Sequence, residues 1–111
     1  MNESIKNNLQ FIIDIIDEVR FILTNVKYDY FLKKPVIKRA LEREVEIIDD
    51  AIQAIQKEDN TIQILSPQKS AEVREFINED NGSLSADVLW IYAQKYLPSL
   101  RENITRILNK E

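Results

Sequence analysis

The sequence predicts an all-α protein, an up-and-down four-helix bundle formed by a single domain over residues 1–111. Apolar residues recur at intervals of three and four along most of the chain, which is the period of one face of an α-helix. The chain contains one glycine and three prolines, so few tight turns interrupt the helices. A chain of this length has room for one domain around one hydrophobic core.

The first helix is expected over residues 3–26, where the apolar stripe is longest. The residues that define the stripe are Ile5, Leu9, Ile12, Ile16, Val19, Leu23 and Val26. Four more apolar residues widen it to about 200° of arc: Phe11, Ile13, Ile15 and Ile22. Because so wide a face contacts more than one neighbour, we expect this helix to lie deep in the bundle.

A second long helix is expected over residues 36–57, after an aromatic segment at 28–32 and the helix-breaking Pro35. Its inward face is formed by Ile37, Leu41, Val45, Ile48, Ile52 and Ile55. Residues 57–60 lose the periodicity and are predicted to form a loop.

A shorter helix is predicted over residues 67–80. Ser66 supplies a cap oxygen and Pro67 fits the first turn, while Asn81-Gly82 ends the helix. The last helix is expected over residues 84–109. Because Pro98 lies inside it, we expect a kink near residues 95–97.

The composition excludes several kinds of catalytic site. The chain has no histidine and no cysteine, so it offers neither an imidazole base nor a thiolate, and no zinc ligands of these types. One glycine cannot build a nucleotide-binding loop. Glu46, Asp49 and Asp50 share one helix surface, but carboxylate-bridged metal sites also use histidines from other helices. We interpret these acids as a solvated face and expect no metal and no cofactor.

The charge pattern argues against a dedicated nucleic-acid protein. The formal net charge is −4 and the pI is about 4.9, whereas phosphate binding needs local positive potential. Five cations fall within eleven residues, with Glu42 as the acid among them: Lys33, Lys34, Lys38, Arg39 and Arg43. We interpret this basic patch as a solvated helix face, with RNA binding as the alternative.

Three aromatic residues near the C-terminus have two possible roles. Trp90, Tyr92 and Tyr96 lie two and six residues apart, partly on one helix face. Such residues are more often part of a core than a stacking platform. The functional alternative is a subunit interface, where Trp and Tyr are enriched.

Several segments together resemble one family. The run Asp87-Val88-Leu89-Trp90 through Leu97-Pro98-Ser99-Leu100 resembles the closing helix of HepT-like proteins of the HEPN superfamily, which are helical ribonuclease toxins. Residues 46–51, Glu-Ile-Ile-Asp-Asp-Ala, are similar to a Glu-Ile-Ile-Gly-Glu-Ala helix of that family. The resemblance covers nearly the whole chain and implies a HEPN-like helical bundle.

The family's catalytic motif, Arg-Asn-x-x-x-His-x-Tyr, precedes its closing helix. Counted back from Trp90, the arginine position holds Arg74, which matches. The asparagine, histidine and tyrosine positions hold Glu75, Glu79 and Asn81, which do not match. The resemblance assigns acid–base catalysis to the histidine, and imidazole is suited to it because its reference pKa is about 6.5. A glutamate, with a reference pKa of about 4.3, is a weaker base and repels phosphate.

The sequence therefore predicts a degenerate HepT-like domain with no catalytic residues, inactive as a ribonuclease. The resemblance implies a role in binding protein: itself as a homodimer, a HEPN homologue, or a nucleotidyltransferase antitoxin. One alternative is a residual RNA-cleaving or RNA-binding protein that uses Arg74 and Glu79. Another is a helical adaptor unrelated to toxin–antitoxin pairs. We expect a cytoplasmic protein without a membrane anchor, since the N-terminus does not resemble a signal peptide.

Overall fold

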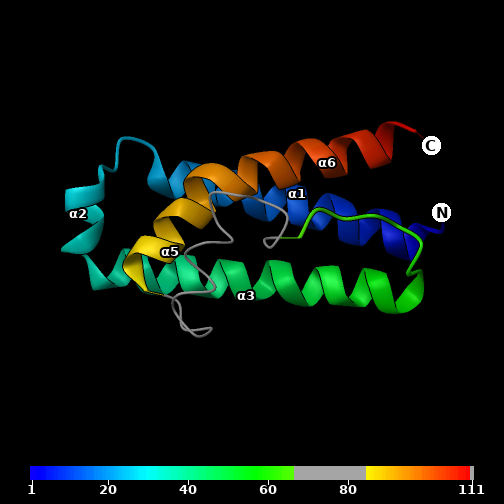
Figure 1. Cartoon of the computed structure of the whole chain (residues 1–111), viewed down its shortest axis with the longest axis horizontal. Helices are drawn as coiled ribbons and strands as arrows, with labels where there is room; N and C mark the ends of the chain where they lie inside the picture. The colour runs from blue at the N-terminus through cyan, green and yellow to red at the C-terminus, as the bar shows by residue number, and fades with distance from the viewer. Residues whose placement is uncertain (67–84, 111) are drawn as a thin grey trace.

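The computed structural model describes residues 1–66 and 85–110, and it confirms the predicted all-α helical bundle (Figure 1). Its helices are α1 (Glu3–Leu23), α2 (Tyr28–Leu32), α3 (Pro35–Glu58), α5 (Ala86–Ile91) and α6 (Leu97–Asn109). A π-helical segment, Tyr92–Tyr96, joins α5 to α6. The described residues contain no β-strand. The helix expected over residues 67–80 lies outside them.

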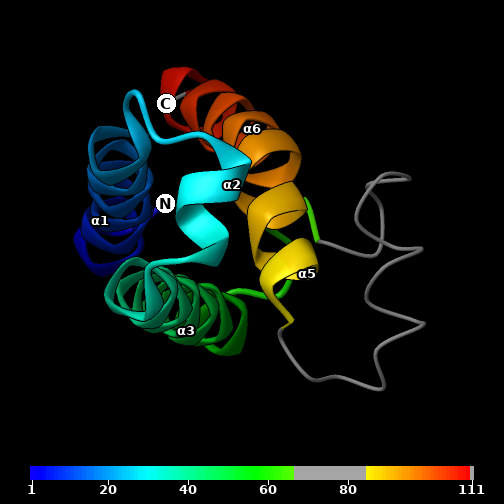
Figure 2. The same cartoon turned by 90° about the vertical axis from the view of Figure 1, so that its left-hand side faces the viewer.

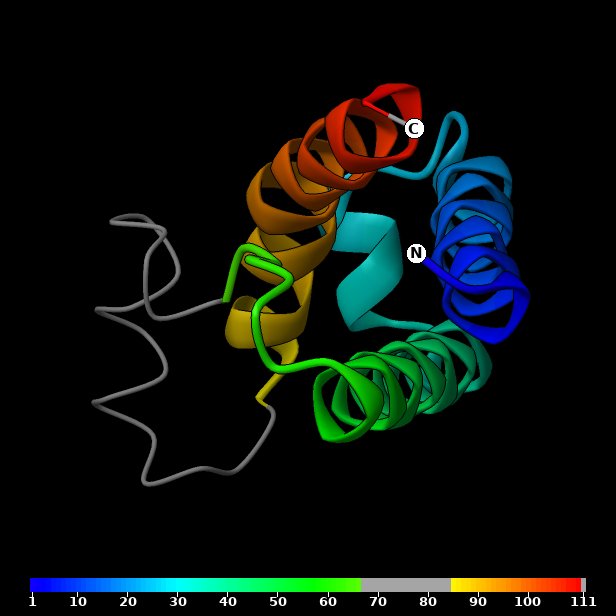
Figure 3. The ribbon, with the colours of Figure 1, turned by 90° about the vertical axis from the view of Figure 1, so that its right-hand side faces the viewer.

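Helix α1 runs antiparallel to both α3 and the α5–α6 rod (Figure 1). Both termini lie at one end of the bundle, and the short helix α2 lies at the other end. Viewed along the bundle, α1 has α3 on one side and α6 on the other, and α2 covers the end of the space between them (Figures 2 and 3). The core is therefore enclosed mainly by α1, α3 and the α5–α6 rod.

Helix α1 buries a wide face, as its sequence predicts. Its buried residues are Ile5, Leu9, Ile12, Ile13, Ile15, Ile16, Val19 and Leu23. Phe11 was expected on this face, but 43% of its surface is exposed. At 100° per residue, Phe11 lies about 120° from the centre of the buried arc. The Phe11 side chain therefore lies outside the buried face. The apolar face of α1 is narrower on that side than the sequence predicts.

Helix α1 ends at Leu23, three residues earlier than predicted. The Thr24 hydroxyl donates a hydrogen bond to the Arg20 carbonyl at 2.8 Å, and Asn25 follows with φ of 63°. Asparagine tolerates this left-handed conformation better than most residues do. The aromatic segment that follows forms α2, a helical turn that the sequence reading did not assign.

The residues before Pro98, where the sequence predicts a kink, form a π-helical segment. Proline has no backbone N–H, so it cannot donate the usual hydrogen bond to the preceding turn. The Leu97 N–H donates to the Tyr92 carbonyl, five residues back, and α6 begins with Pro98 in its first turn. The wider turn places Tyr92 and Tyr96 against α3 and the segment around Leu65.

Two carboxylates, one on α1 and one on α3, have opposite environments. Asp17 accepts two hydrogen bonds from Arg101 of α6, at 2.7 and 3.0 Å, and this pairing lowers the pKa of Asp17. Glu44 of α3 has one carboxylate oxygen buried without a hydrogen-bond partner among the described residues. Burial, and next the neighbouring Glu18 carboxyl, raise the pKa of Glu44. At neutral pH the Asp17–Arg101 pair therefore stabilises the folded protein, whereas the buried Glu44 beside Glu18 destabilises it.

These opposite shifts predict opposite effects of neutralising each acid. Because the folded-state pKa of Glu44 is raised, its contribution to stability falls as pH rises above the ordinary value of 4.5. Glu44→Gln should therefore raise the melting temperature at pH 7, and the gain should vanish near pH 4. The control, Asp17→Asn, should lower it at pH 7, because Asp17 contributes stability above its ordinary value of 3.8. A lower melting temperature for Glu44→Gln at pH 7 would contradict this assignment.

Candidate functional site

The positions of the degenerate motif, Arg74, Glu75, Glu79 and Asn81, lie outside the described residues. The structure does describe the chain on either side of them. On the N-terminal side, the Leu65 N–H donates to the Asn103 side chain at 2.9 Å, and the Leu65 carbonyl accepts from the Tyr96 hydroxyl at 2.5 Å. On the C-terminal side, the Ser85 hydroxyl accepts from the Val88 N–H and caps α5. The described residues on the two sides of the motif therefore contact the last helices: Leu65 bonds to Tyr96 and Asn103, and Ser85 begins α5.

Next to Leu65 lies a polar cleft between α3 and the π-helical segment. Its volume is about 300 Å³, and its lining residues are Asp49, Ile52, Gln53, Gln56, Ile64, Leu65, Ser66 and Tyr96. The Tyr92 hydroxyl donates to the Asp49 carboxylate at 3.4 Å. The Tyr92 and Tyr96 rings meet edge to face, with centroids 4.7 Å apart. The polar groups that border the cleft are therefore one carboxyl, two amides, one aliphatic hydroxyl and a phenol.

Burial governs the titration of the groups beside this cleft. Burial raises the pKa of Asp49, and the hydrogen bond from Tyr92 only partly offsets it. Burial also raises the pKa of Tyr92 and of Tyr96, with a further contribution from the Asp49 charge. Both phenols consequently remain protonated at neutral pH and can donate hydrogen bonds, but they cannot serve as bases. Their geometry fits a structural role that holds residues 64–66 in place.

The predicted acidic group separates into two environments. Glu46 and Asp50 are exposed on α3, whereas Asp49 turns toward Tyr92 and is partly buried. Within residues 1–66 and 85–110, no group of three metal-ligating side chains is placed to hold an ion. The sequence reading put Asp49 on the polar face and missed its contact with Tyr92. The available signal was its spacing: Asp49 lies four residues after Val45 and three before Ile52, which places it at the edge of the apolar face.

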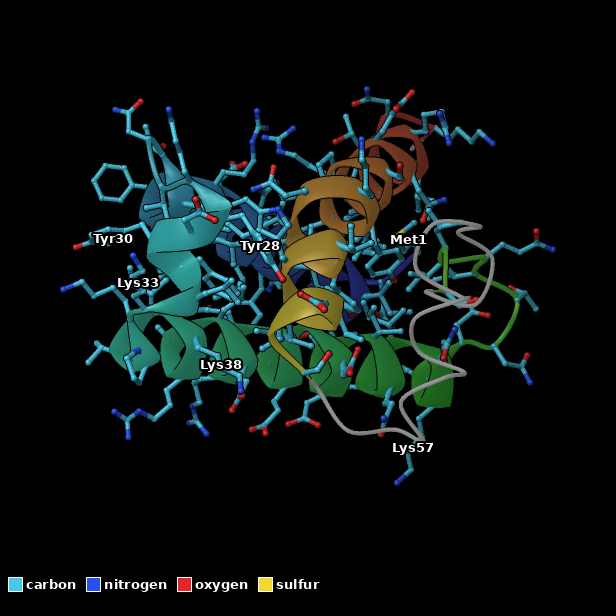
Figure 4. All side chains as sticks on the ribbon, turned by 60° about the vertical axis from the view of Figure 1, so that its left-hand side comes forward. Met1, Tyr28, Tyr30, Lys33, Lys38 and Lys57 are labelled. Carbon is cyan, nitrogen blue, oxygen red and sulfur yellow. The ribbon has the colours of Figure 1, made fainter. Side chains whose placement is uncertain are left out.

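The predicted basic patch lies at the end of the bundle formed by α2 and the start of α3. Lys33, Lys34, Arg39 and Arg43 are exposed, and Lys38 makes a 3.8 Å ion pair with Glu42. The Lys34 ammonium lies 5.2 Å from the centroid of the Tyr30 ring. Figure 4 shows Tyr30 and Lys33 projecting from this end, Lys38 on the nearby part of α3, and Lys57 at the far end of α3. The patch therefore extends from the end of α2 over the first half of α3.

The three aromatic residues act in the core, as the simpler interpretation holds. Tyr92 and Tyr96 are buried. Trp90 is partly buried, and its ring packs against Tyr28 and Phe31 with centroids 5.5 and 5.3 Å apart. A shallow apolar pocket of about 320 Å³ remains beside Trp90, lined by Tyr28, Asp87 and Ile91. These contacts join α5 to α2. They leave part of the indole accessible.

Among the described residues, no helix is both long enough and apolar enough to cross a lipid bilayer.

The Tyr96 hydroxyl should be needed for stability. Tyr96 is fully buried, and Tyr96→Phe would leave the Leu65 carbonyl without this donor. We expect a loss of about 1 kcal/mol in the free energy of unfolding, measured by urea denaturation. Tyr30→Phe is the matched control, because the Tyr30 side chain is half exposed and its ring is retained. Equal stability of Tyr96→Phe and the wild type would show that this bond contributes nothing.

Comparison with known proteins gives one relative of stated function. The protein named "Putative RNase TTE0752", from Caldanaerobacter subterraneus subsp. tengcongensis, is 30% identical over 101 residues. The match spans 87% of this chain and 90% of that protein. No protein-family model matches the chain. No solved structure matches it. At this identity and coverage, the chain belongs to the same family as the protein of that name.

Proposed function

We propose that this protein is a degenerate, HepT-like member of its ribonuclease family, which no longer cleaves RNA and acts by binding protein. The observation that carries the proposal is the absence of histidine from all 111 residues. In the family that the sequence resembles, a histidine performs the proton transfers of RNA cleavage. General acid–base catalysis typically contributes about 10² to 10⁴-fold to a rate. The chain offers no side chain of comparable reference pKa in its place.

The residues at the motif positions strengthen the proposal. Glu79 takes the place of the histidine, and its negative charge would repel the phosphate that Arg74 is expected to contact. Glu75 adds a second negative charge next to Arg74 in the sequence. Asn81 replaces the tyrosine that, in the family, is linked to modification by a nucleotidyltransferase partner. Arg74 alone does not make an active site.

Exposed apolar residues support a binding role. Phe21, Val36, Tyr30 and Leu32 are between 50% and 80% exposed, and Trp90 borders an open apolar pocket. Aromatic and large apolar side chains are enriched at protein interfaces. The partners that fit the proposal are a second copy, a HEPN homologue or a nucleotidyltransferase antitoxin. A nucleotidyltransferase gene beside this one would favour the last of these.

RNA binding without cleavage is the second candidate. The observation that favours it is the exposed basic patch with Tyr30 beside Lys34, because cations and aromatic rings together hold single-stranded nucleic acid. The acidic chain as a whole weighs against it.

An RNA cleavage assay with metal chelated tests the proposal. We expect the wild type to cleave no RNA. Glu79→His alone should not create an efficient ribonuclease, because Glu75 would still partly neutralise the charge of Arg74. The triple variant Glu75→Asn, Glu79→His and Asn81→Tyr should cleave faster than the single variant.

The contrary result is equally specific. Cleavage by the wild type that disappears in Arg74→Ala or Glu79→Gln would overturn the proposal and establish a residual enzyme.

A further inference from the structure

The outer face of α3 carries a row of exposed side chains with the spacing of a helix–helix seam. From Val36 to Lys57 one set of exposed positions recurs at alternating intervals of three and four residues, as the seam positions of a coiled coil do. The residues of this row, here called the α3 stripe, are Val36, Arg39, Arg43, Glu46, Asp50, Gln53 and Lys57. Helix α3 lies along one edge of the bundle, and Lys57 projects away from the other described helices (Figures 1 and 4).

The charges of the stripe are ordered along the helix. Two arginines, Arg39 and Arg43, come first, and two acids, Glu46 and Asp50, follow. Each pair places like charges four residues apart, an arrangement that destabilises an isolated helix. Within the part of the chain that the structure describes, none of the four forms an ion pair. The opposite charges of Arg43 and Glu46, three residues apart, offset this only in part.

This order is self-complementary in one geometry. When two copies of a helix pack antiparallel about a two-fold axis, each residue faces the one equally far from the axis on the other side. With the axis between Glu44 and Val45, Arg39 faces Asp50 of the second copy, and Arg43 faces Glu46. The two-fold repeats both pairs, so every charge of the stripe's centre meets its opposite. We propose that the α3 stripe is the surface through which two copies of this chain pair, antiparallel and two-fold symmetric.

Other arrangements of the same two helices place like charges together. A parallel pair in register would set each arginine against itself and each acid against itself. An antiparallel pair shifted by seven residues one way would bring Arg39 against Arg43, and by seven the other way Glu46 against Asp50. Like charges face to face oppose association, so the pattern selects one direction and one register.

The ends of the stripe fit the same register. Val36, which is 72% exposed, would lie against Gln53 and the exposed Ala54 methyl of the second copy. The contact remains mostly polar and comes mainly from one helix of each copy. It should therefore be a weak, salt-sensitive dimer with a dissociation constant on the order of 10⁻⁵ M.

The inference rests on the part of the proposed function in which the chain binds a second copy, and it names the surface. It also assigns Arg39 and Arg43 of the basic patch a role that does not involve RNA. The test is the mass of the purified protein by sedimentation velocity in about 50 mM and about 500 mM salt. The wild type should dimerise at about 100 μM in low salt and dissociate in high salt.

Charge exchange provides the specific variants. Arg39→Glu with Arg43→Glu makes the centre of the stripe acidic, and it should raise the dissociation constant at least about tenfold. Adding Glu46→Arg and Asp50→Arg restores complementarity with the signs reversed, so the fourfold variant should dimerise again. A chain with only Glu46→Arg and Asp50→Arg should stay monomeric alone and should pair with the double glutamate variant.

Lys95→Glu with Lys110→Glu is the control, because it changes the net charge equally on exposed residues away from the stripe. This variant should dimerise like the wild type.

Each other outcome overturns a defined part of the account. A wild type that is monomeric throughout overturns both this interface and self-binding, and it leaves binding to another protein intact. A dimer that survives Arg39→Glu with Arg43→Glu, or a fourfold variant that stays monomeric, overturns this interface alone. Loss of binding to a labelled single-stranded RNA with no change in mass would assign the arginines to RNA instead.

Discussion

The burial of α1 between two other elements is the contact on which the rest of the structure depends. Its apolar arc faces α3 on one side and α6 on the other, so α1 connects these two helices through one core. Leu9, Ile12 and Ile16 are fully buried, and truncating such residues typically costs about 2–5 kcal/mol. The Asp17–Arg101 pair fixes α6 along the outer edge of this contact. With α1 in place, α3 can leave its opposite face in water.

Most of the fold could be predicted from the sequence because each long helix has a continuous apolar period. That signal gave the presence and approximate bounds of α1 and α3, and Pro98 marked the place where the last helix departs from α-helical geometry. It could not give the exact end of α1, because the stop depends on the conformation of Asn25 and on a hydrogen bond of Thr24. It also missed α2, which is five residues long and too short to show a period. The prediction for Phe11 was wrong because the hydrophobicity of a residue does not reveal how much of the helix surface the neighbouring helices cover.

Less of the candidate site could be predicted. The basic patch lies where the sequence suggested, since its residues are close in the chain. The contact between Asp49 and Tyr92 joins residues far apart in sequence, and only the packing of the π-helical segment against α3 brings them together. The degenerate motif was located by resemblance, and its positions lie outside the described residues. The alternation of charge along α3 is visible in the sequence, but its meaning depends on knowing which face of the helix is exposed.

The central claim is that this member of a ribonuclease family lost cleavage because it lost the group that moves protons near neutral pH. The most direct measurement is the rate of RNA cleavage from pH 5 to pH 9, for the wild type and for the variant with all three motif residues restored. The account predicts a wild-type rate equal to the uncatalysed background at every pH. The restored variant should show a rate that changes near the histidine pKa of about 6.5. A wild-type rate above background, with its own inflection in this range, would contradict the account.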